Sequence, residues 1–147
     1  MNAKHHLYLK LALEVAKEGT CPRAKVGAVL VHDSRPISIG YNGSPRGTEH
    51  CNKIGCWYLT KGKRKHCLRA VHAELNAILN AAYVGISTNG TTLYCTHKPC
   101  VDCLKTLINS GVRNVFYLND YDDELADKLV NHRVFQLKVK LNGKPCV

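Results

Sequence analysis

A His-x-Glu motif at residues 72–74, followed 25 residues later by a Pro-Cys-x-x-Cys motif at 99–103, most constrains how this chain can fold. The two motifs supply one imidazole, two thiols and one carboxylate, carried by His72, Cys100, Cys103 and Glu74. Three protein ligands leave the fourth position of a tetrahedral Zn²⁺ ion open for water, which is typical of a catalytic zinc site. We therefore predict that the imidazole and the two thiolates bind zinc, and that the carboxylate stands beside the metal without binding it.

Both motifs are predicted to lie at the starts of helices. Residues 70–83 are rich in alanine and leucine, and their predicted helix begins around the His-x-Glu motif. A second predicted helix, 100–110, carries Cys100 and Cys103 in its first turn, where a spacing of three residues puts them on one face. Helix N-termini favour thiolates. Two such helices whose N-termini converge at one sheet edge would gather all four groups.

The order of the predicted elements indicates an α/β protein. Hydrophobic periodicity predicts helices at 4–18, 70–83, 100–110 and 122–131, and strands at 26–31, 37–41, 91–95, 112–118 and 134–139. A turn at 32–36 joins the first two strands into a hairpin. This alternation predicts a three-layer α/β/α fold with a mixed five-stranded sheet. Residues 1–147 are expected to form a single domain, with an irregular insertion at 42–68 that a metal would organise.

Composition narrows the class of protein. The chain is 45% hydrophobic and has no run of 18 apolar residues, so we expect no membrane span. Its N-terminus lacks the apolar core of a secretory signal, so we expect a cytoplasmic protein with reduced thiols. The eight cysteines then favour metal binding over a disulfide scaffold. The formal net charge of +10 suits an anionic partner, either a nucleotide or a nucleic acid.

The two motifs together match the H-x-E…P-C-x-x-C signature of zinc-dependent nucleobase deaminases. Three longer segments, within 21–31, 40–47 and 72–78, closely resemble deoxycytidylate (dCMP) deaminases, above all the phage and bacterial forms and the bacterial late-competence homologues. The resemblance covers roughly residues 5–120. It implies the cytidine-deaminase-like fold and the hydrolysis of dCMP to dUMP and ammonia, which supplies thymidylate synthesis.

The resemblance also implies regulation and assembly. Many dCMP deaminases are activated by dCTP and inhibited by dTTP, and they are commonly hexamers. The resemblance therefore implies a homohexamer with a nucleotide effector, carried together with Mg²⁺, near Gly40, Tyr41 and Gly43.

The ligand set suggests how the reaction would proceed. Zinc lowers the pKa of a bound water towards ~7, so that hydroxide forms near neutral pH. The hydroxide would attack the amine-bearing carbon of the base, while Glu74 takes up the water proton and delivers it to the ring nitrogen.

The resemblance places further residues at the substrate. Asn42 is expected to contact the nucleoside, since an amide both donates and accepts hydrogen bonds, with a turn formed by Asn42-Gly43 as the alternative. Val26 and Gly27 are expected to line the base pocket, with a packing role as the alternative for Gly27.

A nucleotide substrate also needs a cation for its phosphate. Arg23 is the first candidate because arginine can grip a phosphate through two hydrogen bonds. Lys25 and Arg46 are weaker candidates, and each of the three is alternatively a surface charge or part of an effector site. Ser44 and Tyr121 could also touch the nucleotide.

Four cysteines outside the first motif point to a second metal. A closed four-ligand site would hold an insertion that lacks its own core, and some phage dCMP deaminases, which this chain resembles, carry a structural zinc there. The candidate ligands are Cys21, Cys51, Cys56 and Cys67, with His50 and His66 as alternates. The alternative is that they are buried thiols that pack as small hydrophobes. Cys95 and Cys146 are expected to be structural and incidental.

Two other functions compete with dCMP deamination. A tRNA or single-stranded nucleic-acid deaminase is favoured by the basic charge and by the cluster at 61–65, but the 40–47 segment favours a nucleotide substrate. A non-catalytic zinc module acting in DNA uptake would have no use for the intact Glu74.

Overall fold

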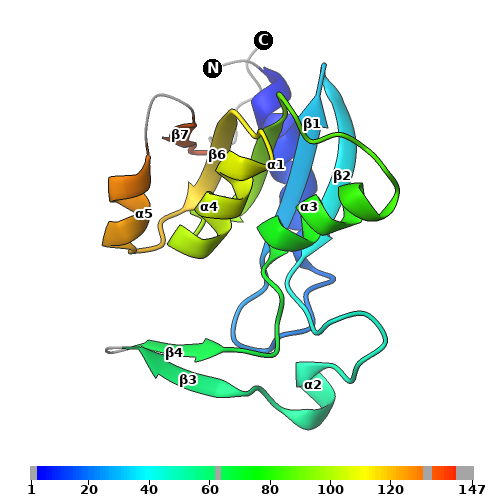
Figure 1. The fold of residues 1–147 in the computed structure, drawn as a ribbon, viewed down its shortest axis with the longest axis vertical. Coiled ribbons are helices and arrows are strands. Elements are labelled where there is room, and N and C mark those ends of the chain that lie inside the picture. The colour runs from blue at the N-terminus through cyan, green and yellow to red at the C-terminus, as the bar shows by residue number, and fades with distance from the viewer. Residues whose placement is uncertain (1–2, 62–63, 131–133, 142–147) are drawn as a thin grey trace.

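A five-stranded mixed sheet forms the centre of the protein (Figure 1). The computed structural model describes residues 3–61, 64–130 and 134–141. The sheet strands, in the order β2-β1-β5-β6-β7, are β1 (Gly27–His32), β2 (Arg35–Tyr41), β5 (Thr92–His97), β6 (Asn114–Asn119) and β7 (Phe135–Lys138). Strand β1 is antiparallel to β2 and β5, whereas β5, β6 and β7 run parallel.

Helices cover both faces of this sheet. They are α1 (Ala3–Ala16), which lies behind the sheet in Figure 1, and α3 (Ala73–Tyr83), α4 (Val101–Asn109) and α5 (Glu124–Leu129), which lie on its other side. Side chains alternate along β1: Val29 and Val31 pack with α1, whereas Ala28 and Leu30 pack in the core beneath α3 and α4. The predicted three-layer α/β/α fold with a mixed five-stranded sheet is confirmed.

The predicted elements occur in the predicted order, but two boundaries were wrong in a way that matters for the site. The predicted helix 70–83 begins only at Ala73, because Val71 is extended and forms an antiparallel bridge with Gly43. The predicted helix 100–110 begins at Val101, with Cys100 as its N-cap. Propensity within a segment cannot reveal such tertiary contacts.

Other boundaries shift by a few residues. The turn predicted at 32–36 is only two residues long, since β2 begins at Arg35. Asp33 and Ser34 form it with φ values of 45° and 63°, as a two-residue hairpin turn of the I′ kind requires. The predicted helix 122–131 is observed as α5, which begins after the N-cap Asp123, and residue 131 lies outside the described residues.

The insertion at 42–68 is more ordered than predicted. It contains the short helix α2 (Cys51–Ile54) and the antiparallel hairpin of β3 (Tyr58–Lys61) and β4 (Arg64–Cys67). These elements lie beyond one end of the main strands, at the bottom of Figure 1. Each is only four residues long, which is too short to produce a periodic pattern in the sequence.

None of the helices in the described parts of the chain has the length and apolar composition needed to cross a bilayer.

Two glycines allow the layers to approach closely. A Cβ atom on Gly27 would lie 2.1 Å from the Ala12 carbonyl oxygen of α1, and one on Gly40 would lie 2.2 Å from the Ala73 carbonyl oxygen of α3. Strand β1 therefore touches the backbone of α1, and strand β2 touches the backbone of α3. The contact with β2 fixes the start of α3 against the sheet.

Replacing Gly27 with alanine should destabilise the protein by about 1–3 kcal/mol, because the added methyl group overlaps backbone atoms of α1. Urea unfolding followed by circular dichroism would measure this change. Lys10→Ala, on an exposed position of the same helix, is the control and should leave the midpoint unchanged. An unchanged midpoint for Gly27→Ala would show that the two layers do not pack this closely.

Candidate active site

The two sequence motifs meet where α3 and α4 begin. His72 is the N-cap of α3 and Cys100 is the N-cap of α4. The Nδ1 atom of His72 lies 3.6 Å from Cys100 Sγ and 3.3 Å from Cys103 Sγ. All three donor atoms lie within 4.8 Å of one another. The convergence predicted from the motifs is therefore present in the fold.

This donor set fits a zinc ion. With Zn–S bonds of about 2.3 Å and Zn–N bonds of about 2.0–2.1 Å, a nitrogen and a sulfur ligand in a tetrahedral site lie about 3.6 Å apart. The observed separations of 3.3 and 3.6 Å are close to this value. In the parts of the chain that the structure describes, no fourth histidine, cysteine or carboxylate joins the cluster. A zinc ion held here would keep one position for a non-protein ligand.

The electrostatics of the cluster also favour a cation. A hydrogen bond from the Cys103 thiol lowers the pKa of Cys100 to about 4, whereas the neighbouring Cys100 and burial raise the pKa of Cys103. The hydrogen bond to Cys100 raises the pKa of His72 to about 9. Without a metal, the thiolate form is therefore favoured at Cys100 and disfavoured at Cys103. A divalent cation would stabilise both as thiolates and bind the imidazole in its neutral form.

Glu74 lies in the first turn of α3 and is only 4% exposed. Burial raises the pKa of its carboxyl, and the positive charge of His72 opposes that rise. A general acid or base that works near neutral pH needs a pKa close to that pH, and burial shifts the pKa of the Glu74 carboxyl in that direction. Glu74 belongs to the lining of a cavity that also exposes His72 and Cys100.

The cavity collects residues from several distant segments. Its remaining lining residues are Cys21, Arg23, Ala24, Val26, Asn42, Lys65, His66, Cys67, Ala70, Ala73, His97, Lys98 and Tyr121. Buried acid, metal-binding donors and exposed cations therefore share one cavity.

Comparison with known proteins assigns this site to a family. A family model described as "Cytidine and deoxycytidylate deaminase zinc-binding region" matches residues 2–119. The chain belongs to this deaminase family. The zinc-binding character of the family agrees with the donor geometry around His72.

Curated relatives include bacterial and phage proteins. The chain is 45% identical over 107 residues to ComE operon protein 2 of Bacillus subtilis, covering 73% of this chain and 54% of that protein. It is 35% identical to the deoxycytidylate deaminase of Enterobacteria phage T2 over an alignment of 148 residues, covering 78% of this chain and 79% of the phage protein. The chain thus spans about half the length of the Bacillus relative and most of the phage one.

A solved deaminase has the same fold. The structure of dCMP deaminase from the cyanophage S-TIM5 in complex with dCMP and dUMP superimposes with a TM-score of 0.74 at 30% identity. The match covers 90% of this chain and 94% of that one. The resemblance to dCMP deaminases inferred from sequence motifs is confirmed.

Among the residues expected to touch substrate, Arg23, Val26, Asn42 and Tyr121 line the deaminase cavity. The Asn42 side chain also shapes it, because Oδ1 accepts a 2.8 Å hydrogen bond from the Val26 backbone N–H and Nδ2 donates a 2.7 Å bond to the Ala24 carbonyl. An amide has one further donor hydrogen and one further lone pair, so these bonds still leave capacity for a ligand.

Other expected contacts lie elsewhere. The Lys25 ammonium donates to the Lys17 carbonyl at 2.9 Å, and the Arg46 guanidinium stacks 4.5 Å from the ring centre of Tyr83. Neither cation lines the deaminase cavity, and neither does Gly27, whose Cα faces α1.

The residues proposed for an effector lie at the end of β2. Gly40 packs against α3, the Tyr41 carbonyl accepts a hydrogen bond from α3, and Gly43 pairs with Val71. Ser44 lies beside Cys51, with its Oγ atom 3.8 Å from the sulfur.

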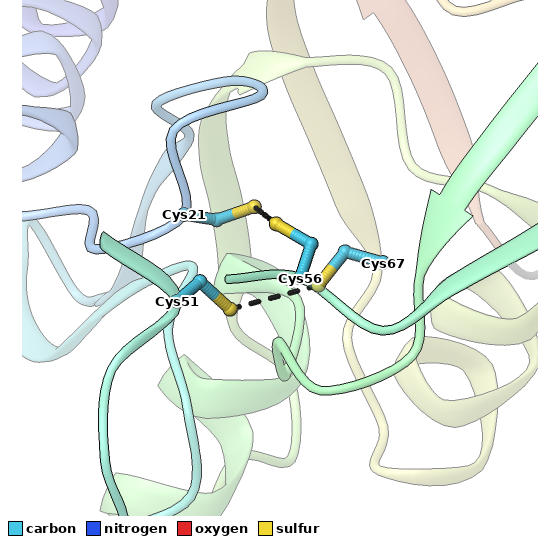
Figure 2. Close-up of side chains that lie close together, drawn as sticks. All are labelled: Cys21, Cys51, Cys56 and Cys67. Atoms are coloured by element: carbon cyan, nitrogen blue, oxygen red, sulfur yellow. Dashed lines mark hydrogen bonds between the residues drawn. The ribbon is translucent and has the colours of Figure 1, made fainter. Parts of the chain in front are cut away.

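Four cysteines form a second cluster near the cavity. Figure 2 shows Cys21, Cys51, Cys56 and Cys67 pointing toward one another from the loop before β1, from α2 and the segment after it, and from β4. All four sulfurs lie within 4.8 Å of one another, and the two closest pairs, Cys21–Cys56 and Cys51–Cys67, are separated by 3.7 and 3.6 Å. Sulfurs in a tetrahedral zinc site lie about 3.8 Å apart, so the spacing fits a closed tetrathiolate site.

The alternates His50 and His66 do not belong to this cluster in the described chain. Burial raises the pKa of the three thiols on Cys21, Cys51 and Cys56. Burial acts on Cys67 in the same direction, but hydrogen bonds from the Ala70 backbone, from the thiols of Cys51 and Cys56 and from the Arg69 backbone outweigh it and lower the pKa to about 7. Backbone and thiol hydrogen bonds together favour a thiolate at this corner of the cluster. The eighth cysteine, Cys146, lies outside the described residues, and Cys95 is buried in the sheet.

Sequence reasoning did not place two lysines of the cavity, Lys65 and Lys98, at the substrate site, and it considered His66 only as an alternate zinc ligand. Lys98 immediately precedes the Pro-Cys-x-x-Cys motif, which was a usable signal, although its ammonium is bonded to Asp127. Lys65 and His66 could not be placed without knowing that residues 58–67 form a hairpin.

Substitutions in the first cluster should separate metal binding from the role of the buried acid. Cys103→Ser should lower bound zinc by about one ion per chain, because it removes one of three donors. Glu74→Gln preserves shape and should leave the zinc content unchanged. Elemental analysis of the purified proteins would measure both. Loss of zinc from Glu74→Gln would identify the carboxylate as a ligand and contradict the assignment of an open position.

Proposed function

We propose that this protein hydrolyses dCMP to dUMP and ammonia. The observation that most strongly supports this proposal is the buried carboxyl of Glu74, which shares a cavity with the cluster of three candidate zinc ligands and with the exposed Arg23. The phage T2 relative is a deoxycytidylate deaminase, and the S-TIM5 enzyme was solved with dCMP and dUMP. Both relatives align with most of this chain, which supports the same substrate.

The roles of the chain's own residues follow from their environments. When bound, zinc supplies the Lewis acidity that makes a water molecule nucleophilic near neutral pH. Glu74 accepts a proton from that water and transfers it to the ring nitrogen N3, which activates C4 for attack. The water oxygen bonds to C4, the bond from C4 to the exocyclic nitrogen breaks, and Glu74 delivers the second proton to the departing ammonia.

The remaining cavity residues would orient the nucleotide. Val26 contributes an apolar side chain for the base, and the spare hydrogen-bonding capacity of Asn42 suits a sugar hydroxyl. Arg23 suits the phosphate, because a guanidinium can donate two parallel hydrogen bonds to phosphate oxygens.

A second candidate is the deamination of single-stranded nucleic acid. The insertion carries Trp57, which is 61% exposed, with the Arg69 guanidinium 3.9 Å from its ring centre. Exposed aromatic rings beside cations are typical of surfaces that stack unpaired bases. A non-catalytic zinc module is the weakest alternative, because such a module has no use for the buried acid.

A turnover assay tests these alternatives. Purified protein is given dCMP, deoxycytidine or a short single-stranded oligonucleotide containing cytosine, and ammonia is measured. We expect ammonia chiefly from dCMP, and Glu74→Gln should lower the rate by about 10²–10⁴-fold with zinc retained. Ammonia from the oligonucleotide alone would replace the leading proposal with the second candidate. Absence of turnover from every substrate by the zinc-loaded protein would favour the non-catalytic module.

We also propose that the four-cysteine cluster binds a second, structural zinc ion, so that each chain holds one catalytic and one structural ion. Cys56→Ser should reduce the zinc content from about two ions per chain to about one, since a closed site loses one of its four ligands. It should also lower the thermal midpoint, because metal binding contributes to the stability of the insertion. Cys95→Ser is the matched control, since Cys95 lies outside both clusters, and it should retain both ions. An unchanged zinc content in Cys56→Ser would mean that the thiols bind no metal.

The homohexamer, the dCTP and dTTP effectors and the effector-bound Mg²⁺ stay predictions from the resemblance, and the cytoplasmic location stays a prediction from the N-terminal sequence. The effector prediction centres on the end of β2, where only Tyr41 among Gly40, Tyr41 and Gly43 has a large exposed side chain.

A further inference from the structure

Both clusters border a single cavity. Cys21 and Cys67 of the four-cysteine cluster line the same cavity as His72, Glu74 and Cys100. The second cluster is therefore part of the wall that a substrate would meet, in addition to joining the insertion to the rest of the chain.

Two cations of this wall stand beside cluster ligands. Arg23 follows Cys21 by two residues, and Lys65 precedes Cys67 by two residues. Both cations line the cavity. Whatever holds the sulfurs of Cys21 and Cys67 together therefore holds the backbones of both cations near each other.

The hairpin register directs Lys65 to the side that carries the cluster. Tyr58 pairs with Cys67 across the hairpin, and side chains directly opposite each other share a face. Lys65 lies two residues from Cys67 on the same strand, so it shares that face as well. Consistently, the Lys65 ammonium lies 5.7 Å from the ring centre of Tyr58. The side chains of Lys65 and Cys67 therefore lie on the same face of the hairpin.

The charges of the cavity suit one anionic group near its exposed side. Glu74 is the carboxylate among the described lining residues, and it is buried. Lys98 is bonded to Asp127, but no carboxylate within the described ranges forms a salt bridge with Arg23 or Lys65. Both of these cations are exposed. A nucleotide whose base reaches Glu74 would extend its phosphate toward them.

The hairpin has little else to hold it. Strands β3 and β4 pair with each other, and in the described chain no other helix or strand packs extensively against them. Trp57, Tyr58 and Leu59 are all exposed, so the hairpin has no apolar core of its own. The thiol cluster is therefore the main constraint on where Lys65 stands.

We propose that Arg23 and Lys65 together bind the 5′-phosphate of the substrate, and that the four-cysteine site fixes them there and so selects a nucleotide over a nucleoside. The proposal rests on the deamination of dCMP proposed above. It gives the second metal site a role in substrate selection beyond stabilising the insertion.

The decisive measurement is selectivity between two substrates that differ only in phosphate. For Lys65→Ala and for Arg23→Ala, kcat/KM for dCMP should fall about 10-fold through a higher KM, because a charge-assisted hydrogen bond is lost. The value for deoxycytidine should stay unchanged. Lys53→Ala is the matched control, since Lys53 is an exposed lysine of α2 that does not line the cavity, and it should change neither value.

A binding experiment tests the roles of Lys65 and of the four-cysteine cluster without requiring turnover. The product dUMP and its nucleoside deoxyuridine are titrated by calorimetry into zinc-loaded wild type, Lys65→Ala and Cys56→Ser. Both variants should lose about 10-fold in affinity for dUMP and none for deoxyuridine, and Cys56→Ser should also lose about one zinc ion per chain. If Cys56→Ser does not fold, Lys65→Ala and Arg23→Ala still decide the matter.

The outcomes separate the two proposals. A wild-type protein that deaminates neither dCMP nor deoxycytidine refutes the proposed function. A wild type active on dCMP, with Lys65→Ala and Arg23→Ala affecting both substrates equally or neither, overturns the phosphate assignment alone. Equal dUMP affinity in wild type and a folded, zinc-depleted Cys56→Ser would show that the second cluster does not hold the phosphate site.

Discussion

Two backbone hydrogen bonds between Gly43 and Val71 determine where the active site forms. The Gly43 N–H donates to the Val71 carbonyl at 3.1 Å, and the Val71 N–H donates back at 2.8 Å. Because Val71 is held extended, α3 cannot begin before Ala73, and His72 becomes its N-cap facing the thiols of α4. A Cβ atom on Gly43 would lie 2.7 Å from the Thr20 hydroxyl, so a larger residue here would require the Thr20 side chain to move.

The same bridge connects the metal ligands to the substrate side of the cavity. Asn42, next to Gly43, accepts a hydrogen bond from the Thr20 N–H through its carbonyl and binds the backbone of residues 24–26 through its side chain. The loop that carries Cys21 and Arg23 is therefore tied to the residue that starts α3. The contact between Gly43 and Val71 thus aligns the reactive end of the cavity, at His72 and Glu74, with its cationic end at Arg23 and Lys65.

The reactive end could be predicted from sequence because its chemistry depends on residue types at short spacings. A histidine, a glutamate and a pair of cysteines three residues apart restrict the geometry before any fold is known. The centre of the sheet was predictable for a related reason, since the buried strand β1 is a nearly continuous apolar run. The start of α3 was not predictable, because a contact with the distant Gly43 overrides helix propensity in residues 70–72.

The cationic end was harder for a physical reason. The position of Lys65 depends on pairing between two four-residue strands and on sulfurs contributed by three segments. No local pattern encodes such an arrangement. Conversely, Arg46 was a weaker phosphate candidate in the sequence, and it stacks on Tyr83 and does not line the cavity. Charge type alone does not identify a phosphate ligand, because the surrounding fold decides which cation faces the site.

The two clusters differ in their number of thiols, with two beside His72 and four in the second cluster, and this difference distinguishes their proposed roles. The β3–β4 hairpin connects the four-cysteine cluster energetically with substrate binding at the cavity. Ordering a residue costs about 1–2 kcal/mol of backbone entropy, so a lysine on an unconstrained hairpin would lose much of its phosphate-binding energy on ordering. A metal held by the four thiolates, as proposed above, would supply that ordering before substrate arrives. Thermodynamic linkage makes the effect reciprocal: a nucleotide that binds better to the ordered hairpin must also tighten metal binding at the four cysteines by the same factor.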